Sequence, residues 1–245
     1  MVNVEADVLA GAHLAQQAET AGVVYSMDYG DQPALTCELV DWAHSSGFEV
    51  VAAGKGTKYL PSYHVSIPDT VWQHYGLSEQ QAHSSGMKNR MFNSFLDGTK
   101  SALEMATIAN ATGLAAPEDG LLFPPAVMDD LAHVLRPLTD GGVLATKGQV
   151  EVVSSLERDG RPVFKDLRWG VYVFIEAPND YSAQCFRQYG MHTDATGRYS
   201  AMYKPFYLIG LELNISILSA ALLNRPTCST NCFSTDVVAV AKSDL

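Results

Sequence analysis

The chain has few basic residues and no glycine-rich dinucleotide turn. Its 16 lysines and arginines stand against 27 aspartates and glutamates, which gives a formal net charge of −11 over 245 residues. This balance argues against a nucleic-acid partner, because binding nucleic acid needs a basic face that displaces counterions. No G-x-G-x-x-G run occurs in the sequence. The chain therefore lacks the usual sequence signal of a backbone cradle for a pyrophosphate.

Cysteines and paired histidines are also scarce. The four cysteines, Cys37, Cys185, Cys228 and Cys232, are too scattered to indicate a disulfide framework. Cys228 and Cys232 stand four apart, but no second Cys or His pair follows them at zinc-site spacing. The seven histidines form no His-x-x-x-His pair. We predict no metal site, and a divalent metal stays an alternative that no motif supports.

No segment of the sequence indicates export or membrane insertion. The first ten residues contain Glu5 and Asp7 and lack a basic start, unlike a signal peptide. The longest apolar stretch, residues 207–223, contains Glu212 and is shorter than the roughly 20 apolar residues that span a bilayer. We expect a buried helix there, no membrane partner and a cytoplasmic protein.

The composition that remains is that of a globular protein, with 47% hydrophobic and 18% charged residues. Periodicity and turn residues predict the following elements: strands at 2–4 and 23–27 around a helix at 7–20, a helix from Asp31 to Gly47, a strand at 48–53 and a loop at 54–61, a short helix capped by Ser78, helices at 94–112 and about 124–135, a hairpin at 151–157 and 161–165, a half-buried strand at 171–176, a polar loop-like region around Asp180, Asp194 and Lys204, an apolar helix after Pro205, and a strand at 236–241.

Strand, helix and strand in close succession at the start indicate a parallel βαβ unit. The fold class predicted is α/β: an α+β catalytic domain with a partial Rossmann βαβ remnant at the N-terminus.

Residues 54–58 form a glycine-lysine loop that follows a predicted strand. Glycines at a strand end let the backbone approach a ligand, and ligand sites favour the carboxyl ends of strands. Lys55 and Lys58 could hold a phosphate or a carboxylate in this acidic chain. An ordinary solvated turn accounts for the loop equally well.

Asp97, Lys100 and Glu104 are spaced to share one stripe of the predicted 94–112 helix. A lysine between two carboxylates could donate a proton to a carbonyl oxygen. Taken alone, the spacing favours an exposed ladder of ion pairs, which is common on solvated helix faces.

Four runs of residues carry a resemblance to a known family: VYSMDYGDQPA (24–34), VAAGKGTKYLP (51–61), FNSFLDGTK (92–100) and YLIGLEL (207–213). They resemble the homoserine-dehydrogenase-like oxidoreductases that end in a SAF domain. The subgroup that the chain resembles most is the deoxyxylulose-phosphate reductoisomerase-like proteins of isoprenoid synthesis.

The resemblance implies a layout of domains. Residues 1–32 would be the C-terminal part of a Rossmann-like nucleotide-binding domain, and 33–200 a catalytic and dimerisation domain. Residues 201–226 would return as a helix to the nucleotide-binding domain, and 227–245 would start a SAF-like domain. We accordingly expect a homodimer, and a chain that lacks parts of the family's layout at both ends.

The resemblance also implies site residues. Asp97 matches a helix aspartate that precedes a catalytic lysine by four, although Lys100 here follows by three. Asn3 and Glu5 fall where homoserine dehydrogenases have an Asn-Lys pair near the nicotinamide, and the missing lysine argues against homoserine. We therefore expect an NAD(P)H-dependent oxidoreductase, using NADPH or NADH, that acts on a small hydroxy or keto substrate carrying a phosphate.

In this interpretation Lys100 polarises or protonates the carbonyl, and Asp97 and Glu104 orient it. The expected substrate-binding residues are Lys55, Lys58, Asn93, Ser94 and Lys204. The alternatives are a homoserine dehydrogenase-like enzyme and a truncated, non-catalytic module that dimerises or binds a metabolite.

Overall fold

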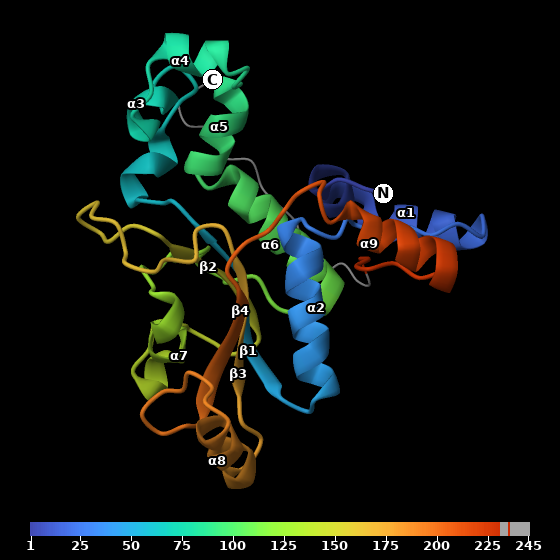
Figure 1. Ribbon diagram of the computed structural model, residues 1–245, viewed down its shortest axis with the longest axis vertical. Helices are drawn as coiled ribbons and strands as arrows, with labels where there is room; N and C mark the ends of the chain where they lie inside the picture. The colour runs from blue at the N-terminus through green and yellow to red at the C-terminus, as the bar shows by residue number, and fades with distance from the viewer. Residues whose placement is uncertain (231–234, 236–245) are drawn as a thin grey trace.

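The fold is built around a four-stranded mixed sheet (Figure 1). The computed structural model describes residues 1–230 and residue 235. The strands are β1 (Glu49–Thr57), β2 (Gln149–Ser154), β3 (Val171–Glu176) and β4 (Tyr199–Lys204), in the order β2-β1-β3-β4. β1 runs parallel to β2 and antiparallel to β3, and β4 is antiparallel to β3. The α/β class predicted from the sequence is confirmed.

Helices connect and flank these strands. In chain order they are α1 (Val4–Thr20), α2 (Gln32–Ser45), η1 (Pro61–Val65), α3 (Val71–Tyr75), α4 (Glu79–Ser84), α5 (Asn89–Leu96), α6 (Thr99–Thr112), η2 (Met128–Asp130), α7 (Leu131–Val134), η3 (Leu138–Asp140), α8 (Asp180–Gln188), α9 (Leu213–Leu218) and η4 (Ser219–Leu223). The last is a single stretch of π-helix. No helix among the described residues is long and apolar enough to cross a membrane.

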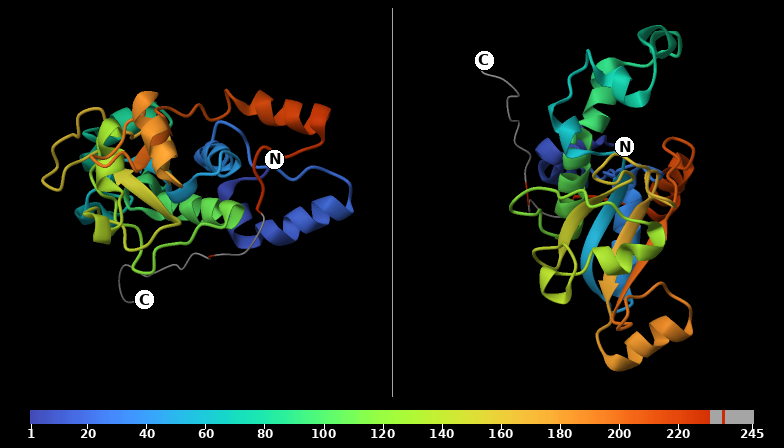
Figure 2. Two further views of the ribbon diagram at one scale, coloured as in Figure 1. Left: turned by 90° about the horizontal axis from the view of Figure 1, so that it is seen from below. Right: turned by 90° about the vertical axis from the view of Figure 1, so that its left-hand side faces the viewer.

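Apolar side chains cover both faces of the sheet. On one face, Val40 of α2 and Ile108 of α6 pack against Val173 and neighbouring strand residues. On the other face, Leu131 of α7 packs with Phe174 and its neighbours. Figure 2 shows the sheet between these two layers. The bounds predicted for the 171–176 strand are confirmed, but its half-buried character is wrong, because both of its faces are covered.

Helices α3, α4 and α5 form a separate apolar cluster at one end of the molecule (Figure 1). Trp72 and Leu96 are buried at its centre. The predicted cap of α4 is confirmed, because the Ser78 hydroxyl accepts from the Gln81 amide and the Gln81 side chain accepts in return from the Ser78 backbone. This reciprocal bonding satisfies two backbone donors at the helix start.

The N-terminal segment holds less strand than the sequence predicts. α1 begins at Val4, where the Asn3 side chain accepts from the Ala6 amide at 3.0 Å. Acidic side chains in the first turn favour this helix start, which takes up the end of the predicted 2–4 strand. Of the predicted strands at 2–4 and 23–27, one parallel bridge between Val2 and Met27 remains. α1 packs against α6. The proposed domain boundaries stay predictions.

The helix predicted over 94–112 is two helices. α5 ends at Leu96 and α6 starts at Thr99, and Gly98 adopts φ +91° between them. This left-handed conformation suits glycine and interrupts the helix. Asp97 therefore does not share a helical stripe with Lys100 and Glu104.

Three further predictions about the second half need correction. Residues 161–165 form no strand, and only a bridge between Leu156 and Pro162 marks the hairpin. The helix predicted from 124 begins later, as η2 and α7. The region taken as loop-like contains α8 and β4, with Lys204 as the last residue of β4.

The apolar helix after Pro205 is exposed rather than buried. Ile217 is 49% exposed on α9, and Leu222 is 76% exposed on η4. The apolar character of this segment is plain in the sequence. Its exposure is not, because it depends on which other elements pack against the segment. The strand predicted at 236–241 lies outside the described residues, as does most of the predicted SAF-like start at 227–245.

Candidate active site

Lys55 and Glu104 form a buried ion pair beside the carboxyl end of β1. Their residues are 6% and 1% exposed, and Lys55 Nζ donates to Glu104 Oε2. Residues 54–57 belong to β1 and are not the loop that the sequence predicts. A Cβ on Gly56 would lie 2.0 Å from the Leu167 carbonyl oxygen, so this glycine serves a close approach of backbone rather than of a ligand.

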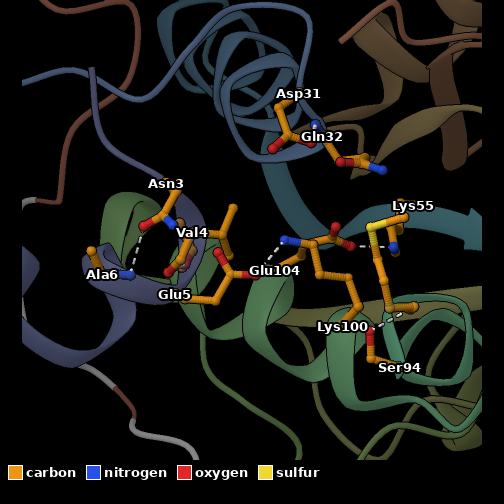
Figure 3. A network of polar contacts seen from close by, with 12 residues as sticks. Asn3, Val4, Glu5, Ala6, Asp31, Gln32, Lys55, Ser94, Lys100 and Glu104 are labelled. Atoms are coloured by element: carbon orange, nitrogen blue, oxygen red, sulfur yellow. Dashed lines mark hydrogen bonds and ion pairs between the residues drawn. The ribbon is translucent and has the colours of Figure 1, made fainter. Parts of the chain in front are cut away.

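Lys100 lies one helical turn before Glu104 on α6. Its Nζ donates to Glu5 Oε1 at 2.8 Å, which brings the start of α1 to the same site (Figure 3). Burial acts to lower the pKa of Lys100, but the Glu5 hydrogen bond and the charges of Glu104, Glu5 and Asp31 raise it. Lys100 is a firmly protonated cation among carboxylates.

Asp31 and Gln32 enter the site from the start of α2 (Figure 3). Asp31 Oδ1 accepts from the Gln32 amide at 2.8 Å and caps the helix. Burial, reinforced by the negative charge of Glu104, raises the pKa of Asp31 to about 6. A carboxyl group that titrates near neutral pH can act as an acid or a base.

Gln32 brings an unsatisfied polar atom to the site. It is 3% exposed, and its Oε1 has no hydrogen-bond partner in the part of the chain that the structure describes. An unpaired buried polar atom is costly, so such an atom next to charged groups marks a place where a ligand can bond.

Tyr207 and Arg168 complete the surroundings. Burial and the charges of Glu104 and Asp31 raise the pKa of Tyr207 to about 12, against a hydrogen bond from Gln32 and the charge of Arg168. The Trp169 ring lies 6.1 Å from the Tyr207 ring, between centroids. Sequence reasoning gave Asp31 only a capping role and gave Gln32, Tyr207 and Arg168 none. The runs 24–34 and 207–213 did contain the first three.

Asn3 and Glu5, which the sequence predicted near the nicotinamide, have different contacts in the structure. Glu5 meets Lys100, but the Asn3 side chain is used as the cap of α1. Figure 3 shows both at the N-terminal edge of the cluster.

Asp97, Asn93 and Ser94 are not part of the Lys55–Glu104–Lys100 cluster. Asn93 Nδ2 donates to Asp97 Oδ2 at 3.0 Å, and Asp97 Oδ1 accepts from the Thr99 amide at 2.9 Å. These bonds hold the joint between α5 and α6. Ser94 is partly buried, and its hydroxyl donates to the Met91 carbonyl oxygen at 2.7 Å. Their predicted catalytic and substrate-binding roles have no support in these contacts.

The remaining two lysines lie at the margin. Lys58 Nζ donates to the His74 carbonyl oxygen at 2.7 Å, and burial together with the charge of Arg168 lowers its pKa. Lys204 Nζ donates to Glu212 Oε1 at 2.6 Å and lies over the Tyr29 ring. Within residues 1–230 and 235, no group of three metal-ligating side chains occurs.

Comparison with known proteins identifies one family. A family model described as "Oxidoreductase DRL, catalytic domain" matches residues 30–213, a range that holds Asp31, Gln32, Lys55, Lys100 and Glu104 but not Asn3 or Glu5. A comparison with curated proteins found no match. The family model covers most of the chain, and the chain therefore belongs to the oxidoreductase DRL family through its catalytic domain.

Proposed function

We propose that this chain carries the substrate-handling part of an NAD(P)H-dependent oxidoreductase that acts on a small, phosphorylated hydroxy or keto compound. The observation that supports this proposal best is the meeting of Lys100, Asp31 and the unpaired Gln32 Oε1 around the buried Glu104. A cation, a carboxyl group that titrates near 6 and a free acceptor are the groups that polarise a carbonyl, move a proton and orient a substrate.

The cluster offers a binding group for the nicotinamide end of the cofactor, but the sequence shows no binding motif for its pyrophosphate. Gln32 Oε1 offers a buried acceptor to a carboxamide, whereas no glycine-rich turn for a pyrophosphate occurs in the sequence. When bound, the nicotinamide would supply the hydride. The chain's own part is to bind and orient the carbonyl compound and to hold the proton.

A phosphate on the substrate is supported by two cations at the margin of the site. Arg168 and Lys58 form no ion pair with a carboxylate among the described residues, and the positive charge of Arg168 acts to lower the pKa of Lys58 and of Tyr207. Gly56 brings their two segments together, because an added Cβ there would lie 2.9 Å from the Arg168 backbone nitrogen. Two nearby cations with no carboxylate partner in this part of the chain favour an anion such as a phosphate.

The nucleotide-binding body is proposed to pack on the side where α1 and α9 project. Both helices lie on the same side of the sheet and its covering helices in Figures 1 and 2. The exposed apolar side chains of α9 and η4 favour coverage by another protein surface. This arrangement agrees with the predicted return of residues 201–226 to that domain.

Lys100→Ala tests the proposed role in the intact protein. With deoxyxylulose phosphate as the first substrate tried, kcat should fall roughly 10²–10⁴-fold while the unfolding midpoint changes little. Glu5→Gln is the matched control, because it removes the negative charge that pairs with Lys100 and keeps the cation. Turnover of Lys100→Ala at the wild-type rate would refute the role.

A non-catalytic, metabolite-binding module is the second candidate, because the sequence has no glycine-rich turn. Titration of the chain with NADPH, followed by nicotinamide fluorescence, separates the two. Saturable binding that Gln32→Leu weakens supports the oxidoreductase, and no binding together with no turnover supports the module. Turnover of homoserine in preference to the phosphorylated compound would identify the homoserine dehydrogenase-like alternative.

A further inference from the structure

Two buried thiols from distant parts of the chain lie in contact behind the site. Cys37 on α2 and Cys228 after η4 are 4% and 6% exposed, and their sulfurs lie 2.7 Å apart. Non-bonded heavy atoms normally rest roughly 3.5–4.0 Å apart. A disulfide requires a sulfur separation of about 2.0 Å, so only a small displacement separates these thiols from a bond.

The two segments that carry the thiols are already docked. Cys37 and Cys228 pack in one apolar cluster with Met27, Ala34 and Ala111. The Met27 amide donates to the Cys228 carbonyl oxygen at 2.9 Å, which fixes the backbone on that side. Closing the bond therefore needs side-chain movement rather than rearrangement of the chain.

We propose that Cys37 and Cys228 form an oxidation site at which a hydroperoxide closes a disulfide between α2 and residues 226–230. This inference is independent of the substrate proposed above. It assigns a role to two residues that the oxidoreductase reaction does not use.

The chemistry balances with hydrogen peroxide as the two-electron oxidant. One thiolate attacks a peroxide oxygen, the O–O bond breaks, and a sulfenic acid and one water form. The second thiol then attacks the sulfenic sulfur and displaces a second water, leaving the S–S bond. Two thiols are oxidised, one peroxide is reduced to two waters, and both thiol protons leave in the water.

The surroundings make this reaction slow. The Cys37 thiol, burial and the nearby charges of Asp7 and Asp41 hold the pKa of Cys228 well above its usual range. The thiolate is the nucleophile, so a raised pKa lowers the rate of attack. The pair is expected to stay reduced until oxidant is sustained.

A disulfide here would join the elements behind the active site. Thr230 Oγ1 donates to the Asp7 carboxylate of α1 at 2.7 Å, and the same helix carries Glu5, the partner of Lys100. α2 carries Asp31 and Gln32 at its start. The bond would also close a separation of 191 residues in sequence. A long closed loop restricts the unfolded chain strongly, so oxidation should raise the unfolding temperature.

The test uses the full chain with Cys185→Ser and Cys232→Ser, which leaves Cys37 and Cys228. Cys232 lies outside the described residues and is replaced so that it cannot compete. After peroxide treatment we expect a mass loss of about 2 Da, a cross-linked peptide that joins the two cysteines, and an unfolding temperature several degrees higher. A thiol reductant should reverse all three.

The matched control adds Cys37→Ala to this background. It should show no mass loss of about 2 Da and no oxidant-dependent rise in unfolding temperature. Two outcomes would overturn the proposal: both thiols of the two-cysteine protein still react with a thiol reagent after peroxide treatment and denaturation, or the wild-type chain links Cys228 to Cys232 instead.

Discussion

Replacing Glu104 by glutamine removes one charge from a buried ion pair and leaves its partner in place. Lys55 is 6% exposed and Glu104 1%, so water reaches neither charge easily. Removal of one partner from a buried pair typically costs about 3–5 kcal/mol, because the remaining charge stays buried without compensation. For a chain of this size, that loss corresponds to a fall in the unfolding temperature of roughly 6–20 °C.

Urea unfolding of wild type and Glu104→Gln measures this cost. Glu5→Gln is the matched control, because it breaks the ion pair with Lys100, in which the Glu5 side chain is 47% exposed. That partly exposed pair should contribute no more than about 1 kcal/mol.

A double replacement, Lys55→Met with Glu104→Leu, separates the cost of an unpaired charge from the value of the pair. It should recover most of the stability that Glu104→Gln loses, because apolar side chains of similar volume need no compensation. Equal stability of Glu104→Gln and Glu5→Gln would refute this reasoning.

Three further predictions concern Gly56, Asp31 and the oligomeric state. Gly56→Ala should destabilise the fold by several kcal/mol, because its Cβ would lie 2.0 Å from the Leu167 carbonyl oxygen; an unchanged urea midpoint would contradict this. Asp31 has a pKa of about 6 when folded against an ordinary 3.8, so wild-type stability should fall from about pH 4 to about pH 6 and then level off. Asp31→Asn, which can still cap α2, should lack this fall, and parallel pH curves for the two proteins would be the contrary result. The chain is predicted to form a homodimer of about twice its 26.5 kDa, and light scattering at the monomer mass across micromolar concentrations would exclude it.

The sequence indicates much of the sheet and the chemistry of the central cluster. Alternating and β-branched residues predict the bounds of β3, and a capping aspartate with a first-turn proline predicts the start of α2. Lys55 and Lys100 stand out as lysines in the family-like runs and Glu104 by its helical spacing from Lys100, and the structure brings all three together.

Other features depend on contacts that no local pattern contains. Asp31 looks like an ordinary helix cap, and only the distant Glu104 and burial move its pKa toward neutrality. The glycines at 54 and 56 look like a loop, yet both lie in β1. Neighbouring backbone approaches each so closely that a Cβ would clash with it. One glycine in the left-handed conformation at 98 ends the stripe on which Asp97 had been placed.

Lys100 and Asp31 differ in how readily each releases a proton at neutral pH. Burial acts to lower the pKa of Lys100, but the Glu5 hydrogen bond and the charges of three carboxylates raise it above the ordinary 10.5. A group with so high a pKa holds its proton, so Lys100 suits polarisation of a carbonyl oxygen rather than proton transfer. Asp31, with a pKa of about 6, is the better acid in the same cluster.

This division predicts a pH profile for carbonyl reduction. If Asp31 supplies the proton, kcat/KM should fall about tenfold per pH unit above about pH 6, as its protonated fraction falls. Asp31→Asn should give a low and flat profile. Glu104→Gln should move the inflection to lower pH, because the Glu104 charge helps to raise the Asp31 pKa. Lys100→Gln should lower the whole profile without removing the inflection. An inflection that persists in Asp31→Asn would refute Asp31 as the acid, and an inflection near pH 10 that Lys100→Gln removes would return that role to Lys100.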